Sequence, residues 1–140
     1  MANICSNYLV VSGEQQLIDI ETKSIEILNK FDFNQVKPYA ENGNLVFAFI
    51  ESKYTPFTRV DENDNEGLLI CNAFIDAGLS FMNYYEELGF NEYGCHIVNQ
   101  NENIEVSLTS EEIELCKNNS SWFDRMDKML NEKIEKRNNN

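Results

Sequence analysis

Three carboxylates stand close together beside aromatic residues, and here the chain has the residue types that could do chemistry. They are Glu86, Glu87 and Glu92, among Tyr84, Tyr85, Phe90 and Tyr93. Two carboxylates can act as general acid and base, as in glycoside hydrolysis. Carboxylates so near in sequence are more often surface charge, at a polar sheet edge above core aromatics. The mixture also suits an interface, where aromatic side chains are buried and acids attract a basic partner. We expect no catalytic residues here and a partner-binding role for Tyr84, Glu86, Glu87 and Glu92.

A second acidic group occupies residues 61–67, which read Asp-Glu-Asn-Asp-Asn-Glu-Gly. An EF-hand calcium loop that began at Asp61 would need Gly at its sixth position and Glu at its twelfth. The chain has Glu66 and Asn72 there, so the sequence predicts no EF-hand. Adventitious binding of a divalent cation by the clustered carboxylates is one interpretation; otherwise the segment is a solvated acidic loop or a partner-binding loop. In the last case the contact is made by Asp61, Glu62, Asp64 and Glu66.

The cysteines and the single histidine give no pattern of a metal or catalytic site. Cys5, Cys71, Cys95 and Cys116 are widely spaced and form no CxxC pair, so we expect reduced, buried thiols. Cys95 and His96 are neighbours in a predicted strand, where successive side chains point to opposite faces. They should share neither a metal nor a nucleophilic role, and we expect a structural His96. The sequence predicts no cofactor and no metal site.

The negative charge is concentrated in one stretch. Residues 41–114 contain fifteen Asp and Glu against only Lys53 and Arg59, whereas the two flanks together are neutral. The stretch therefore carries the whole net charge of −13. A ligand with a phosphate backbone must be neutralised by Lys and Arg, so the charge argues against direct nucleic-acid binding and for a basic partner. Glu102 and Glu105 belong to the same acidic face.

The predicted elements place these residues on and between the strands of one sheet. Runs rich in β-branched and aromatic residues predict strands over 3–12, 44–51, 79–87, 93–99 and 104–108. The run 45–50 is continuously apolar and predicts a central strand buried on both faces. Apolar residues at helical spacing predict helices over 14–30 and 68–77, and 31–43 is predicted to be a connector.

The C-terminal part is predicted to be helical. Thr109 and Glu112 form a capping-box pattern that begins a closing helix, and residues 118–121 end it. A second helix over 122–136 packs on its own sheet or pairs with a second subunit in a homodimer. The order β-α-β-α-β-β-β-α predicts an α+β, ferredoxin-like sandwich, with a mixed or antiparallel sheet and helices mainly on one face. We expect one domain over 1–137, in which 115–137 are a C-terminal helical extension, and a frayed tail over 138–140.

The chain shows no apolar run of about 18 residues, the length that a membrane helix needs. Its first residues have neither the basic nor the long apolar region of a signal peptide. We therefore expect a cytoplasmic protein with no membrane partner.

Three segments, in order, carry a family resemblance. They are Asn3-Ile4-Cys5-Ser6-Asn7 at the start of the first predicted strand, Phe49-Ile50-Glu51-Ser52-Lys53-Tyr54-Thr55-Pro56 at a strand end, and Tyr85-Glu86-Glu87-Leu88-Gly89-Phe90 followed by Gly94. They resemble the motifs of the YubB-type ferredoxin-like domain proteins of plasmids and phages. Ile4 replaces the family's usual Trp, and Phe57 replaces a second Pro. The resemblance implies the ferredoxin-like topology and a mobile-element setting; it implies neither an enzymatic activity nor an iron–sulfur cluster.

These observations lead to one functional expectation and two alternatives. We expect a non-enzymatic phage or mobile-element inhibitor of a host nucleic-acid-directed defence complex, comparable to an anti-CRISPR protein. Its acidic face would bind a basic host protein or ribonucleoprotein, as a mimic of nucleic acid. One alternative is a small accessory ligand-binding module or enzyme that uses carboxylates near Glu86 and Glu92. The other is an acidic accessory protein without a dedicated basic partner, whose charge keeps it soluble.

Overall fold

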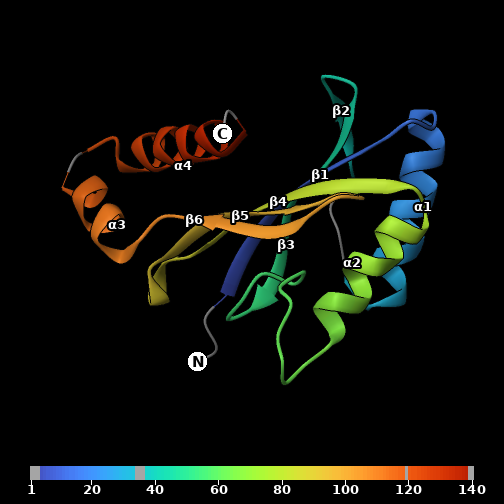
Figure 1. Ribbon diagram of the computed structural model, residues 1–140, viewed down its shortest axis with the longest axis horizontal. Helices are drawn as coiled ribbons and strands as arrows, with labels where there is room; N and C mark the ends of the chain where they lie inside the picture. Colours follow the sequence, from blue (N-terminus) through green and yellow to red (C-terminus); the bar gives the residue numbers. More distant parts are fainter. Residues whose placement is uncertain (1–3, 34–36, 119, 139–140) are drawn as a thin grey trace.

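Six strands form one antiparallel sheet in the computed structural model, which describes residues 4–33, 37–118 and 120–138. Their order across the sheet is β2-β3-β1-β4-β5-β6 (Figure 1). The strands are β1 (Ile4–Gly13), β2 (Tyr39–Glu41), β3 (Asn44–Lys53), β4 (Leu79–Glu87), β5 (Glu92–Val98) and β6 (Asn103–Ser107). The helices are α1 (Leu17–Lys30), α2 (Glu66–Asp76), α3 (Ser110–Lys117) and α4 (Trp122–Asn138), with a short 3-10 turn, η1 (Leu88–Phe90), after β4.

The connections make the fold ferredoxin-like, as the sequence predicted. The β1-α1-β2 unit joins two strands that have β3 between them, and the β3-α2-β4 unit joins two strands that have β1 between them. Interleaving two such split βαβ units gives the ferredoxin-like core. Strands β5 and β6 then extend the sheet beyond β4, and α3 and α4 form the C-terminal helical extension.

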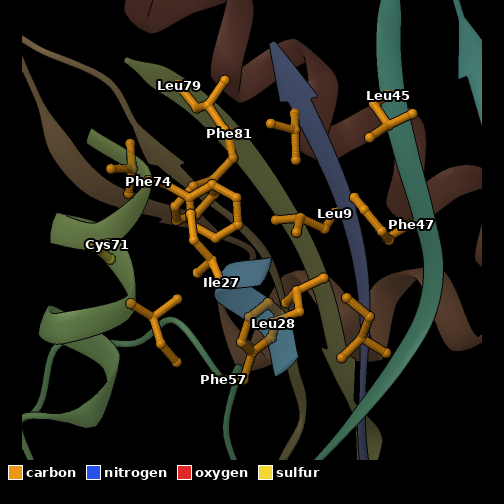
Figure 2. Close-up of a cluster of buried hydrophobic side chains, with 14 of the residues drawn as sticks. Leu9, Ile27, Leu28, Leu45, Phe47, Phe57, Cys71, Phe74, Leu79 and Phe81 are labelled. Atoms are coloured by element: carbon orange, nitrogen blue, oxygen red, sulfur yellow. The ribbon is translucent and has the colours of Figure 1, made fainter. Parts of the chain in front are cut away.

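Helices α1 and α2 cover one face of the sheet and enclose the larger core. Alternate residues of β4 are buried on this face, in agreement with its period-two pattern. Phe47, Phe74 and Phe81 are almost fully buried in the cluster that Figure 2 shows. The rings of Phe74 and Phe81 pack edge to face, with centroids 5.2 Å apart. Burying a side chain of this size contributes about 1.5–3 kcal/mol to folding.

Helices α3 and α4 lie on the opposite face, over β5 and β6 (Figure 1). A second core forms there around Cys95, Met126 and Leu130. The predicted capping box begins α3: the Glu112 amide donates to Thr109 Oγ1 at 3.1 Å, and the Thr109 amide donates to Glu112 Oε1 at 2.8 Å. The core helices thus share one face, and the extension adds a third layer over part of the other.

A β-bulge in β3 corrects one expectation. The run 45–50 was expected to be buried on both faces, but Phe49 is 73% exposed and has φ +62°. The register with β1 shifts at this point: Asn7 lies opposite Ile50, whereas Leu9 lies opposite Phe47. Two residues of β3 therefore face one residue of β1, and the extra residue turns outward.

Two further differences concern the ends and the connector. Strand β2 is three exposed residues within the stretch expected to be a connector, and such a short edge strand leaves no periodic pattern. Asn138 ends α4, and the rest of the predicted frayed tail lies outside the described residues. Asn3, the first residue of the predicted first strand, also lies outside them. None of the helices in the described ranges has the length and apolar character that crossing a membrane requires.

Candidate partner-binding site

The loop between β3 and α2 borders an open, acidic depression of about 910 Å³. We call it the acidic hollow. Its lining carries five carboxylates and two bases, Lys53 and Arg59. The acids are Asp32, Glu51, Asp61, Asp64 and Glu66. Three of the residues predicted to bind a partner thus lie together here: Asp61, Asp64 and Glu66.

The acidic loop owes its shape to its own carboxylates. Asp61 Oδ1 accepts the Asn63 amide at 2.9 Å, and Asp64 Oδ1 accepts the Glu66 amide at 3.0 Å. Gly67 then packs so tightly that a Cβ there would lie 1.9 Å from the carbonyl oxygen of Arg59. Short side-chain-to-backbone bonds of this kind favour turns, so the loop displays its acids from a defined backbone. The predicted acidic loop is confirmed for residues 61–65, whereas Glu66 and Gly67 already belong to α2.

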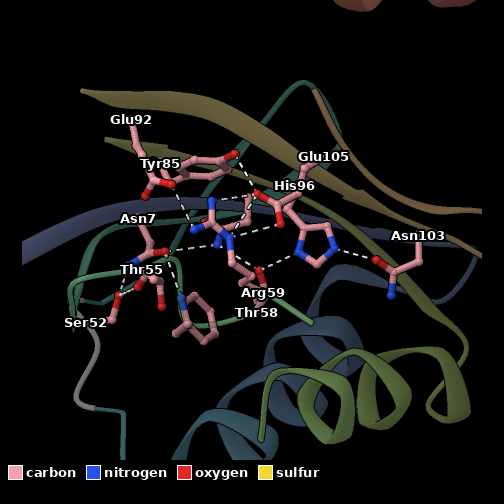
Figure 3. A network of polar contacts seen from close by, with 12 residues as sticks. Asn7, Ser52, Thr55, Thr58, Arg59, Tyr85, Glu92, His96, Asn103 and Glu105 are labelled. Atoms are coloured by element: carbon pink, nitrogen blue, oxygen red, sulfur yellow. Dashed lines mark hydrogen bonds and ion pairs between the residues drawn. The ribbon is translucent and has the colours of Figure 1, made fainter. Parts of the chain in front are cut away.

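Arg59 ties this loop to strands β5 and β6 at one edge of the sheet (Figure 3). Its guanidinium bonds Glu92 and Glu105, each at 2.9 Å, and lies 5.5 Å from the centre of the Tyr85 ring. The Tyr85 hydroxyl donates to Glu105 at 2.7 Å. Burial alone would raise the pKa of Glu105, but the bonds from Arg59 and Tyr85 outweigh it and lower that pKa. Glu92 and Glu105 therefore share the one positive charge of Arg59 within the fold.

Beside Arg59 lies a row of polar groups that looks like a hydroxyl–imidazole–amide triad (Figure 3). Thr58 Oγ1 is 2.8 Å from His96 Nδ1, and His96 Nε2 is 2.5 Å from Asn103 Oδ1. Such a row can activate a nucleophile. However, Thr58 and His96 are 0% and 1% exposed, so a substrate cannot reach the hydroxyl. Burial lowers the pKa of His96, and the neutral ring bridges the Thr58 loop to β6.

A second depression, of about 390 Å³, lies between the sheet and the start of α4. We call it the aromatic groove. Its lining includes two carboxylates, Glu86 and Asp127, and the rings of Tyr8, Phe49, Tyr84, Tyr93 and Phe123. Burial and the neighbouring charge of Asp127 raise the pKa of Glu86. Of the predicted binding residues, Tyr84 and Glu86 are here.

The remaining predicted residues are scattered. Glu62 is exposed at the tip of the acidic loop. Glu87 is 3% exposed and its Oε1 accepts the Gly89 amide at 3.0 Å, so its side chain lies inside the fold. Glu102 forms an ion pair with Arg137 of α4 at 3.0 Å.

Of the three carboxylates that were considered for acid–base chemistry, the structure separates Glu86 from Glu87 and Glu92. Glu86 lies opposite Tyr93, whereas Glu87 lies opposite Glu92. Because side chains alternate along a strand, Glu86 and Glu92 point to opposite faces of the sheet. Cys95 and His96 diverge in the same way, Cys95 toward α4 and His96 toward Thr58.

Sequence reasoning missed Phe49, Asp127 and two acids of the hollow, Asp32 and Glu51. Phe49 stood inside an apolar run, and nothing local distinguishes it from its buried neighbours. Asp127 is one of several charges on an amphipathic helix, and only the packing of α4 on the sheet brings it to Glu86. A carboxylate directly after the apolar run was the single available signal, and it points to Glu51.

No family model, no curated protein and no solved structure matches the chain. The resemblance to the YubB-type family therefore stays an expectation drawn from the three segments that carry it.

Proposed function

We propose that the protein binds a basic surface of a host nucleic-acid-directed defence complex, such as a CRISPR effector. It inhibits the complex by occupying the site that nucleic acid would fill. The resemblance to plasmid and phage proteins supports the mobile-element setting. The observation that carries the proposal is the acidic hollow, where five carboxylates gather on one depression beside an exposed aromatic side chain, Phe49.

The charge balance supports a partner outside the chain. The protein has 24 Asp and Glu and 11 Lys and Arg, so even complete internal pairing would leave a large acidic surplus. In the described part of the chain, three bases form ion pairs with four carboxylates, Glu92, Glu102, Glu105 and Glu112. These four lie outside the hollow, so its acids remain available to a basic groove, where a row of carboxylates can replace phosphates.

The test is inhibition of a purified RNA-guided effector nuclease at two salt concentrations. We expect the protein to compete with target DNA and to lose affinity as salt rises. The test variant neutralises the hollow while keeping its hydrogen-bond acceptors: Glu51→Gln, Asp61→Asn, Asp64→Asn and Glu66→Gln. At about 0.5 kcal/mol for each exposed charge pair, inhibition should weaken roughly thirtyfold.

The matched control removes the same charge from the other end of the chain: Glu14→Gln, Asp19→Asn, Glu21→Gln and Glu26→Gln. It should inhibit nearly as well as the unaltered protein. Equal losses in both variants would show that only net charge matters. Inhibition that ignores salt, or no inhibition of any effector tested, would reject nucleic-acid mimicry and favour an acidic accessory protein.

A further inference from the structure

The aromatic groove is a built depression with its own chemistry, separate from the acidic hollow. It is formed by the central strands β1 and β4 below and by the first turns of α4 above. Its volume of about 390 Å³ is at the small end of the range for ligand pockets. Phe49 belongs to the lining of both depressions, so the two depressions adjoin at this residue.

Two carboxylates inside the groove have no compensating base among the described residues that line it. Glu86 comes from β4 and Asp127 from α4. The Tyr93 hydroxyl donates to Asp127 and holds it toward β5. Burial and Asp127 raise the pKa of Glu86, as expected when like charges share a half-buried site. A bound cation would relieve this repulsion.

The rest of the lining is aromatic. Tyr84 and Tyr8 face each other across β4 and β1, and their rings meet edge to face with centroids 6.4 Å apart. Phe49 and Phe123 flank the opening and are 73% and 43% exposed. Aromatic faces attract cations, and a left-handed conformation at a bulky residue such as Phe49 is costly enough to suggest a functional use.

We propose that the aromatic groove binds the guanidinium group of an arginine side chain supplied by the basic partner. Carboxylates alone would accept any cation, but aromatic faces beside carboxylates favour a planar group that can both stack and form paired hydrogen bonds. Arginine combines these properties, whereas the lysine ammonium is a compact, strongly hydrated charge. Because the arginine comes from the partner described above, the inference rests on the proposed function.

The direct test uses three capped tripeptides, with arginine, lysine or citrulline between two glycines. Citrulline keeps the shape of arginine without its charge. We expect the arginine peptide, at millimolar concentration, to shift the NMR signals of Tyr84, Glu86 and Asp127. The lysine peptide should bind more weakly, and the citrulline peptide about tenfold more weakly, because hydrogen bonds to charged groups are the stronger ones.

Variants of the groove carboxylates complete the test. Glu86→Gln and Asp127→Asn should each weaken binding of the arginine peptide about tenfold. The control is Glu135→Gln, which changes an exposed carboxylate on α4, the helix of Asp127. It should bind the arginine peptide as the unaltered protein does. Glu86→Gln removes one of two repelling charges, so its unfolding midpoint at neutral pH should not fall. This control separates lost binding from lost folding.

The outcomes distinguish the groove from the proposed function. Equal binding of the arginine and citrulline peptides, or no binding, overturns the groove proposal whatever the partner is. The groove proposal also fails if the acidic-hollow variant loses inhibition of the effector while Glu86→Gln and Asp127→Asn keep it. Binding of the arginine peptide without inhibition of any effector supports the arginine site in the groove and rejects the proposed function. A dimer that dissociates in Glu86→Gln overturns the proposal, because an arginine of a second copy, and not of a basic partner, would then be the occupant.

Discussion

The bulge at Phe49 predicts an inversion of the usual order of alanine and glycine in a strand. Phe49 has φ +62°, where an L-residue costs about 1–2 kcal/mol and glycine costs nothing sterically. Glycine in a strand normally loses about 0.5–1 kcal/mol to alanine through backbone entropy. At position 49 the relief exceeds this loss, so Phe49→Gly should be more stable than Phe49→Ala by roughly 0.5–1 kcal/mol.

The comparison isolates the backbone because both variants lose the aromatic ring, which is 73% exposed. The free energy of unfolding is measured by urea denaturation, followed by circular dichroism, with a common m-value. Ala48→Gly, one residue earlier in the same strand, is the control. Its φ is negative, so glycine should there cost at least about 0.5 kcal/mol.

If Phe49→Ala proves as stable as Phe49→Gly, or more stable, residue 49 does not have a left-handed backbone conformation and the β-bulge is not at this position. If the predicted order holds, both variants should still lose affinity for the arginine peptide, since neither keeps a ring at the groove. Stability and binding would then make opposite demands on one residue. That conflict is the behaviour expected where backbone strain is retained for a function.

Three further predictions address the Arg59 ion pairs, the tight turn and the thiols. Arg59→Met should lower the free energy of unfolding by about 2 kcal/mol, measured by urea denaturation. This is less than the cost of breaking a fully buried ion pair, because Arg59 and its two glutamates are partly exposed. The control, Lys53→Met, should leave the free energy of unfolding nearly unchanged. The pKa of Glu105 is lowered from 4.5 in the folded protein. The stabilisation by its ion pair with Arg59 is therefore present above pH 4.5 and lost as pH falls through the lowered pKa. The stability difference between the unaltered protein and Arg59→Met should shrink in acid, and a difference that does not change with pH would contradict the ion-pair account. Gly67→Ala should cost at least about 1–3 kcal/mol through the clash with the Arg59 carbonyl, whereas the exposed Asn72→Ala on the same helix should stay within about 0.5 kcal/mol. The four cysteine thiols should resist alkylation by iodoacetamide at pH 8 until the protein is unfolded. All four are buried, and burial raises the pKa of Cys5 and Cys95 to about 12. Rapid labelling of the folded protein would contradict this and would mean that solvent enters the two hydrophobic cores.

The sequence predicted the elements that depend on a pattern of residues close together in the chain. Alternation predicted β4, and the Thr109–Glu112 pair predicted the first residue of α3, because each depends on residues within one strand or one turn. The ferredoxin-like topology followed from the order of these elements, since short connections leave few ways to arrange them.

The parts that the sequence did not predict depend on partners distant in the chain. The bulge at Phe49 exists because β1 pairs with β3 in a shifted register, and no residue near Phe49 predicts it. The pairing of Glu86 with Asp127 arises when α4 packs across the sheet. Charge counting found the acidic stretch but not that Arg59 and the C-terminal bases Lys133 and Arg137 form ion pairs with four of its members.

The bases of α4 have a consequence for how the protein meets a partner. Lys133 and Arg137 neutralise Glu112 and Glu102 on the α4 side of the sheet, whereas the acidic loop before α2 lies on the opposite side (Figure 1). Separated charge of this kind gives the molecule a permanent electric dipole. In the field of a basic surface, torque on that dipole turns the acidic loop forward before any atoms touch, which raises the fraction of productive collisions. Added salt would then slow association far more than it speeds dissociation.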